Sequence, residues 1–280
     1  MTSIDLSYLR QWVGRQERAD DSVRPIAARQ MAAALSRGHR VPAESDDLPL
    51  LWHWLCFPAI ADGSELGLDG HPARGHFLPP VPLPRRMWAA GRLVLHRAPR
   101  IGEPLRRIST IADVKAKDGC SGPLVFVIVK HEIESRGQPC ITEWQDIVYR
   151  DAARPGVGPR PIQAAEEAAV CETVPVNATL LFRYSALTFN GHRIHYDRDY
   201  ATGVEGYPGL VVHGPLVATL LAGLLERTAN VIPVRYFEFR AVRPLFDFDT
   251  VTLYAQANDG TVSLWARNGS GHLAMSATAR

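Results

Sequence analysis

The sequence contains few cysteines, nearly equal numbers of basic and acidic side chains, and no long apolar run. Four cysteines are spread over 280 residues, and no two of them form a Cys-x-x-Cys pair. That pattern argues against a disulfide framework or a cysteine-based zinc site. The 31 basic and 29 acidic side chains leave a net charge of +2, so the chain lacks the basic excess of a nucleic-acid-binding protein. We expect a protein with reduced thiols that does not bind nucleic acid.

Signals for membrane insertion or secretion are also missing. The N-terminal residues show no positive segment followed by an apolar run, which a secretory signal requires. The most apolar stretch, 48–61, contains His53 and Pro58 and is too short to span a bilayer. We therefore expect no membrane partner and a cytoplasmic location.

What is present fits a globular protein of two packed halves. A length of 280 residues, 46% of them hydrophobic and 21% charged, is long for one domain and sufficient for two cores. Helical spacing predicts helices over 4–18, capped by Asp5, and over 25–36, ended by Gly38. Residues 66–84 are rich in glycine and proline, which predicts a loop or an extended arm.

Strand signals dominate the rest of both halves. Residues 87–149 read as strands, and the composition shift over 151–172 indicates a linker. In the second half, the apolar run 215–226 predicts a helix too hydrophobic to lie on the surface. The strands expected after that helix are 234–242, 249–257, 261–268 and 272–279.

The two halves repeat one another in the order of their landmarks. Each has an early strand ending near an Arg-Ala pair, then a long strand ending in an Asp-Gly turn, and a last strand that closes on arginine. These landmarks are Arg97-Ala98, Asp118-Gly119 and Arg150 in one half, and Arg240-Ala241, Asp259-Gly260 and Arg280 in the other. A helix followed by an antiparallel sheet, twice over, is a duplicated α+β unit. A helix wrapped by such a sheet is the hotdog arrangement, so we predict two fused hotdog domains, 1–150 and 173–280.

The densest group of polar side chains, 182–197, lies just before His213-Gly214-Pro215 at the start of the apolar helix. A helix start has unpaired N–H groups and partial positive charge, which suit a developing oxyanion. His195 can move protons near neutral pH, and Asn190 can orient water or a carbonyl. An oxyanion donor and a proton shuttle are what addition of water to an α,β-unsaturated thioester requires, because an enolate forms on the thioester oxygen.

This segment resembles the MaoC-like enoyl-thioester hydratases, in which an aspartate and a histidine stand five residues apart before the hotdog helix. Asn190 and His195 match that pair, and Gly214 matches the glycine whose N–H is the oxyanion donor. Asparagine cannot act as a base at neutral pH, so the resemblance places acid/base work on His195 and leaves Asn190 to orient. A turn role for Asn190, which precedes Gly191, is equally compatible.

The likeness is closest to the group of 3-methylfumaryl-CoA and itaconyl-CoA hydratases. It rests on the Asp-Gly-His-Pro-Ala-Arg-Gly run at 69–75, the proline-rich arm at 77–88 and Tyr-Ser-Ala-Leu-Thr-Phe-Asn at 184–190. The resemblance implies a CoA thioester substrate, citramalyl-CoA as product and no separate cofactor. It leaves the two enoyl substrates undecided; itaconyl-CoA, whose double bond is not conjugated to the thioester, would need prior isomerisation. The hotdog fold and the resemblance to this group of hydratases are both compatible with a homodimer.

Both substrates carry a free carboxylate, for which arginine is a suitable partner. The sequence does not decide which of four arginines binds this carboxylate. A tyrosine and a histidine near the site are further candidates for substrate contact. These substrate-binding candidates are Arg183, Arg193, Arg85, Arg86, Tyr184 and His213. The N-terminal half has no matching Asn/His pattern, so we expect it to shape the pocket, with CoA between the halves.

Other interpretations stay open. His192 and His195 with nearby Asp197 are too few ligands for a metal prediction, and we predict none. A 3-hydroxyacyl-thioester dehydratase of fatty-acid metabolism would share the fold and differ in its pocket. A non-catalytic acyl-CoA-binding protein would explain Asn190, but not His195 together with Gly214. A thioesterase would need a carboxylate on the catalytic loop.

Overall fold

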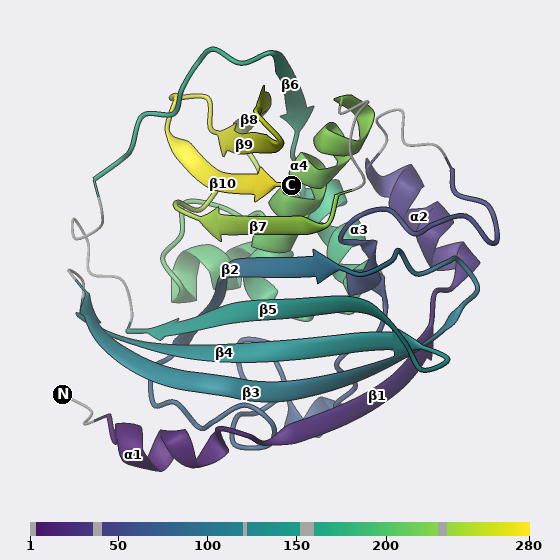
Figure 1. Ribbon diagram of the computed structural model, residues 1–280. Coiled ribbons are helices and arrows are strands. Elements are labelled where there is room, and N and C mark those ends of the chain that lie inside the picture. The colour runs from purple at the N-terminus through teal and green to yellow at the C-terminus, as the bar shows by residue number, and fades with distance from the viewer. Residues whose placement is uncertain (1–3, 36–40, 120–121, 152–159, 229–233) are drawn as a thin grey trace.

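One antiparallel sheet joins the two halves of the molecule (Figure 1). The computed structural model describes residues 4–35, 41–119, 122–151, 160–228 and 234–280. The strands of the first half are β1 (Gln16–Ser22), β2 (Arg85–Leu95), β3 (Pro104–Gly119), β4 (Gly122–Ser135) and β5 (Gln138–Arg150). Those of the second half are β6 (Val170–Pro175), β7 (Tyr236–Ala241), β8 (Thr250–Asn258), β9 (Thr261–Arg267) and β10 (Leu273–Ala279).

The strand order repeats between the halves. The sheet runs β1-β3-β4-β5-β2-β7-β10-β9-β8-β6, so from each outer edge the strands follow as first, third, fourth, fifth and second. Antiparallel pairing of β2 with β7 joins the halves, with Leu93 opposite Phe237. The duplicated α+β unit expected from the sequence is therefore present.

The helix predicted at 215–226 is confirmed as α4 (Gly214–Thr228). Its residues from Leu216 to Leu225 are all buried, and it packs against β8, β9 and β10. A helix that is apolar on all sides is stable only inside a core, and this one fills the concave side of the C-terminal sheet. The helix also contacts β2, the strand through which the two halves pair.

The N-terminal half differs in what its sheet encloses. The predicted helix over 25–36 is confirmed as α2 (Pro25–Leu35), while Gly38 lies outside the described residues. This helix packs against α3 (Ala178–Thr188) and the short turn η2 (Trp52–Leu55). Residues of β4 and β5 instead border a cavity. The first sheet thus forms part of the cavity wall.

The predicted helix over 4–18 is wrong for most of its length. Helix α1 spans only Leu6–Leu9, continues as the 3-10 turn η1 (Arg10–Trp12), and is capped by Asp5, whose carboxylate accepts from the N–H of Tyr8. Gly14 then turns the chain with a φ of +88°. The next residues form β1 and pair along β3, because an open sheet edge satisfies backbone groups that a short helix would leave exposed.

The remaining local expectations largely agree with the structure. The arm over 66–84 has no helix or strand apart from an isolated bridge between Leu66 and Pro72, and its proline-rich part leads into β2. Strand β6 begins at Val170, so the last residues of the range interpreted as a linker pair with β8. Among the described residues, no helix is long and apolar enough to cross a membrane.

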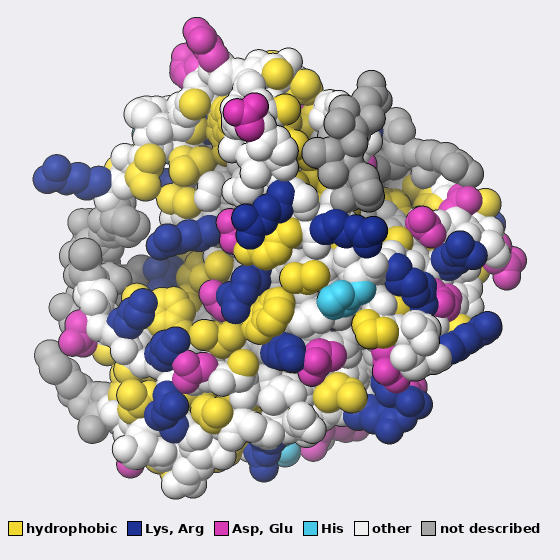
Figure 2. All heavy atoms as spheres, in the orientation of Figure 1, with side chains coloured by type: hydrophobic (Ala, Val, Ile, Leu, Met, Phe, Trp, Pro, Cys, Tyr) yellow, Lys and Arg dark blue, Asp and Glu magenta, His cyan; other side chains and the backbone are white. Residues whose placement is uncertain are grey.

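The sheet face turned toward the viewer carries side chains of both charges. Figure 2 shows Lys and Arg interspersed with acidic and apolar side chains across this face. Salt bridges join neighbouring strands or residues of the sheet, such as Arg106 with Asp20 and Lys130 with Glu132. The mixture agrees with the small net charge of the sequence.

Candidate active site

A cavity of about 1520 Å³ lies between the two halves. Its walls come from β4, β5 and the 57–78 loop of the first half, and from 182–217 and 241–246 of the second. The cavity contains three residues predicted to be catalytic, namely Asn190, His195 and Gly214. The N-terminus of α4 and the histidine loop therefore face one space, as their sequence positions suggested.

His195 is held by the backbone. It ends the 3-10 turn η4 (Arg193–His195), and its ring Nδ1 lies 2.7 Å from the carbonyl oxygen of Val211. A carbonyl can only accept, so Nδ1 carries the hydrogen and Nε2 is left with a free lone pair. Burial lowers the pKa of His195 to about 4. At neutral pH the side chain is thus a neutral base with Nε2 as the basic atom.

His213 supports His195 from behind. The two rings stack at 3.6 Å between centroids, and the hydroxyl of Ser185 on α3 lies 2.8 Å from Nε2 of His213. His213 is completely buried and does not line the cavity, and burial holds its pKa well below the ordinary value. It was predicted to contact substrate, but in the structure it packs behind the ring of His195 and is not part of the cavity lining.

Gly214 is the first residue of α4. A Cβ built on it would meet no atom closer than the Trp88 carbonyl oxygen at 3.6 Å, so packing within the protein does not require glycine here. The first N–H groups of a helix have no intrahelical acceptor. The Gly214 N–H is therefore available beside the cavity, where it can stabilise an anionic oxygen.

Asn190 makes a turn at the end of α3. Phe189 ends that helix with a φ of +53°, and the side-chain oxygen of Asn190 accepts a hydrogen bond from the N–H of His192 at 3.0 Å. The turn role weighed from the sequence is thus present. Because the oxygen is used, the amide NH₂ is the part that remains for a ligand.

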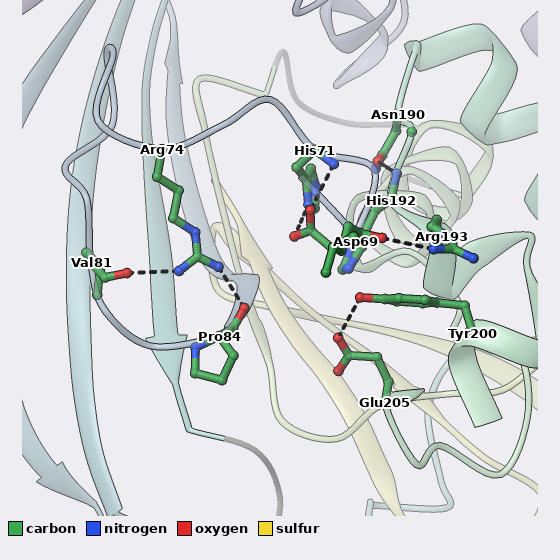
Figure 3. Close-up of polar contacts among 12 residues, drawn as sticks. Asp69, His71, Arg74, Val81, Pro84, Asn190, His192, Arg193, Tyr200 and Glu205 are labelled. Atoms are coloured by element: carbon green, nitrogen blue, oxygen red, sulfur yellow. Dashed lines mark hydrogen bonds and ion pairs between the residues drawn. The ribbon is translucent and has the colours of Figure 1, made fainter. Parts of the chain in front are cut away.

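A second imidazole enters the site from the N-terminal half (Figure 3). Nδ1 of His71 lies 3.1 Å from a carboxylate oxygen of Asp69, whose other oxygen accepts from the His71 N–H at 3.0 Å. The ring of His71 is 4.2 Å from that of His192, which is 5.3 Å from that of His195. Burial and the charge of Arg86 lower the pKa of His71 to about 4.

Two glycines allow this meeting of distant segments. Gly70 has a φ of +84°, and a Cβ there would lie 2.0 Å from the carbonyl oxygen of Gly191. The N–H of Arg193 donates to the Asp69 carbonyl at 2.9 Å, and the Arg193 guanidinium donates to the Leu68 carbonyl at 3.0 Å. The backbones of the arm and the catalytic loop are therefore in direct contact.

The candidate arginines separate into different environments. Arg193 also pairs with Asp197 at 2.7 Å and does not line the cavity, and Arg183 is exposed on α3, away from the cavity wall. Arg85 reaches the cavity but pairs with Glu205 at 2.9 Å. Arg86 lines the cavity and has no hydrogen-bond or carboxylate partner among the described residues. Of the four, Arg86 is the free cation nearest the histidines.

Other polar side chains also line the cavity. Tyr184 borders the cavity at α3, with its ring 5.0 Å from that of His213. On the N-terminal side, buried Glu143 lies 3.1 Å from Nε2 of His53 and accepts from the indole of Trp54 at 2.9 Å.

One group of side chains has the composition of a metal site. Ligand atoms of Asp69, His71 and His192 lie within 4.8 Å of one another. This is not the His192, His195 and Asp197 set considered from the sequence. Burial lowers the pKa of His71 and His192, and the charge of Arg86 lowers both further, so it opposes an added cation there. We do not assign a metal to these residues.

Sequence reasoning named the main loop but missed two contributors. His71 and Asp69 lay in a motif used for the family resemblance, without a role. Their only local signal was a turn-forming Asp-Gly before a histidine, and nothing in the sequence indicates that this turn meets Gly191.

The comparisons with known proteins agree with this arrangement. The family model "hydroxyacyl-thioester dehydratase type 2" matches residues 51–247. The chain is 46% identical to the mesaconyl-C(4)-CoA hydratase of Chloroflexus aurantiacus over 268 residues, covering 95% of each protein.

Solved structures extend the likeness to the fold. A MaoC-like dehydratase from Phytophthora capsici superposes with a TM-score of 0.73 at 12% identity, covering 98% of this chain and 97% of that one. A conserved protein from Mycobacterium tuberculosis, described as having a double hotdog fold, gives a TM-score of 0.55 at 16% identity, covering 95% and 96%. The prediction of two fused hotdog domains is confirmed.

Proposed function

We propose a substrate for this chain on the premise that it belongs to the hydroxyacyl-thioester dehydratase type 2 family. The chain is accordingly an enzyme of the hydro-lyase type. Our proposal is that it reversibly hydrates 3-methylfumaryl-CoA, also called mesaconyl-C4-CoA, to citramalyl-CoA. Its relative of known activity in Chloroflexus aurantiacus carries that substrate in its name.

The chemical steps follow from the site geometry. The reacting water is hydrogen-bonded to Nε2 of His195. This nitrogen takes a proton from the water while the water oxygen bonds to the methyl-bearing β-carbon of the substrate. The electrons of the double bond move to the thioester oxygen, where the Gly214 N–H and the N-terminus of α4 stabilise the enolate. The protonated His195 then gives its proton to the α-carbon. One water is added, and the base returns to its neutral form.

The observation that carries the choice of substrate is the free guanidinium of Arg86. The substrate has a carboxylate on the carbon that water attacks, so its partner must lie beside the catalytic histidines. Arg86 lines the cavity and is close enough to His71 and His192 to lower the pKa of both. We propose that Arg86 binds the free carboxylate of the substrate in a bidentate manner.

A dehydratase for longer acyl chains is a second candidate, favoured by the apolar lining on the N-terminal side of the cavity. Val129, Ile133 and Ile147 contribute to that lining. A straight acyl chain would extend along them and would have no use for Arg86. The two substrates are therefore distinguished by how activity depends on one arginine.

The test compares hydration of 3-methylfumaryl-CoA, itaconyl-CoA and crotonyl-CoA by the wild type, Arg86→Gln and Arg183→Gln. We expect the wild type to prefer 3-methylfumaryl-CoA, and Arg86→Gln to lose about 10- to 10²-fold in kcat/KM for it, since a charged hydrogen-bonded contact is worth about 1.5–3 kcal/mol. Arg183→Gln, outside the cavity, serves as the matched control. Equal losses on all substrates, or a wild-type preference for crotonyl-CoA, would contradict the proposal.

A further inference from the structure

The arm from the N-terminal half brings a carboxylate into the site that the catalytic loop lacks. In the MaoC-like hydratases that this loop resembles, an aspartate stands at the position of Asn190, and an asparagine side chain cannot act as a base at neutral pH. The oxygen of Asn190 is also occupied by the N–H of His192. Asp69 and His71 lie beside His192, where the contact of Gly70 with Gly191 holds them.

The hydrogen bond from His71 to Asp69 decides which nitrogen of His71 is free. Burial alone would raise the pKa of the Asp69 carboxyl, but its hydrogen bonds from His71 keep it below the usual value, so it is an ionised acceptor. Nδ1 of His71 must then carry the hydrogen, and Nε2 is an acceptor. Among the described residues, no group donates to Nε2 of His71 or to Nε2 of His195.

Both imidazoles line the same cavity, and the ring centroid of His192 lies 4.2 Å from that of His71 and 5.3 Å from that of His195. Each is fixed in the same tautomer by an acceptor at Nδ1, a carbonyl for His195 and a carboxylate for His71. Such a pair of free acceptors matches the two hydrogens of a single water molecule.

We propose that His71, oriented by Asp69, is a second catalytic imidazole that takes the place of the carboxylate missing at Asn190. This inference rests on the proposed hydration. The attacking water donates one hydrogen to Nε2 of His195 and the other to Nε2 of His71. The first is transferred to His195 and later to the α-carbon. The second stays on oxygen and becomes the hydroxyl hydrogen of the product, so His71 remains neutral throughout and Asp69 acts as a positioning residue.

The decisive variant is His71→Asn, because an asparagine side chain can keep the contact with Asp69 while removing the acceptor at the position of Nε2. We expect kcat to fall by about 10²–10⁴-fold, the range for loss of a positioned acid/base group, with KM nearly unchanged. Adding Asn190→Asp to this variant restores a carboxylate next to the water, and we expect it to recover at least ten-fold in kcat. A merely structural role for His71 gives no such recovery.

Asp69→Asn is the second variant, for the case that His71→Asn does not fold. It keeps the side-chain shape but allows an amide to donate to Nδ1, which turns Nε2 into a donor; we expect a loss of kcat of similar size. His272→Asn, whose side chain lies outside the cavity lining, is the matched control. A kcat within three-fold of the wild type in both His71→Asn and Asp69→Asn would overturn the proposal. A failure of Asn190→Asp to raise the kcat of the His71→Asn variant would overturn it as well.

Two further results distinguish a catalytic His71 from a failure of the hydration itself and from a bound metal. If the wild type hydrates the substrate and depends on His195 while His71→Asn remains fully active, only the proposed role of His71 is contradicted. A wild type that does not hydrate the substrate would contradict the proposed hydration function. We also expect protein treated with EDTA to keep its kcat. A loss reversed by Zn²⁺ would assign Asp69, His71 and His192 to a metal and overturn the proposal.

Discussion

The ring Nδ1 of His195 and the carbonyl oxygen of Val211, 2.7 Å apart, determine which atom of the active site is basic. The same Val211 donates its N–H to the Ile194 carbonyl at 2.9 Å, so two contacts fix the catalytic turn to one residue. The imidazole cannot rotate or change tautomer without losing the buried hydrogen bond. His195 lines the cavity, where we propose that water and the thioester meet.

The activity should be independent of pH across the neutral range. Burial lowers the pKa of His195 to about 4, and the neutral form is the active base. We expect kcat to be flat from about pH 8 to pH 5.5 and to fall as the pH approaches 4, because protonation removes the acceptor at Nε2. Steady-state rates in overlapping buffers, with intrinsic fluorescence to monitor unfolding, measure this. An inflection near pH 6.5 would show a solvated His195 and contradict this account.

The fold should lose stability in mild acid. Burial lowers the pKa of His71 and His131 to about 4 and that of His213 well below its ordinary value, whereas unfolded histidine titrates near pH 6.5. Between these values the unfolded chain binds protons that the native state does not. The free energy of unfolding therefore falls as pH decreases below about 6.5, by up to about 1.4 kcal/mol per pH unit for each histidine.

Urea unfolding at pH 7.5, 6.0 and 5.0 checks this slope. The variant His131→Gln, on β4, removes one of the buried imidazoles and should reduce the pH dependence by up to about one proton. A free energy of unfolding that is constant from pH 7.5 to 5.0 would mean that these side chains are accessible to protons in the native state.

Gly70→Ala tests the contact between the arm and the catalytic loop. The added Cβ would lie 2.0 Å from the Gly191 carbonyl oxygen, so the arm must move away and take His71 with it. We expect kcat to fall by at least about ten-fold, since displacement by about 1 Å can cost 10²-fold. Thermal unfolding and steady-state kinetics give the two readouts.

Gly14→Ala is the matched control for that variant. Gly14 has a similar φ of +88°, but a Cβ there meets nothing within 4 Å. It should carry only the backbone strain of about 1–2 kcal/mol and leave kcat unchanged. Equal effects of the two substitutions on kcat would exclude a specific role for the Gly70 and Gly191 contact.

The sequence was sufficient for the parts of the fold that rest on local pattern. The helix α4 and the repeated strand landmarks could be predicted without tertiary information. A continuous apolar run indicates a helix buried on every side, and the turn residues are consecutive in the sequence. The first residues of β1, 16–18, were predicted as the end of a helix because their structure comes from pairing with β3, a partner that no local pattern indicates. Tertiary pairing overrode a weak helical spacing there.

The site shows the same division. His195 and Gly214 could be placed from their spacing around the helix start. Arg193 and His213 are close to them in sequence, but Arg193 binds Asp197 and the arm, and His213 is turned into the core toward Ser185. His71 belongs to the site only because two distant glycines let their backbones touch, and that approach cannot be deduced from one sequence.

The most direct test of the account follows the enoyl-thioester absorbance with 3-methylfumaryl-CoA and crotonyl-CoA, for the wild type and His195→Ala. We expect rapid loss of absorbance with 3-methylfumaryl-CoA, formation of citramalyl-CoA by mass, and a decrease of about 10³-fold or more in His195→Ala, which has lost its base. Hydration that persists in a folded His195→Ala protein, or a wild type that binds both thioesters and hydrates neither, would contradict it.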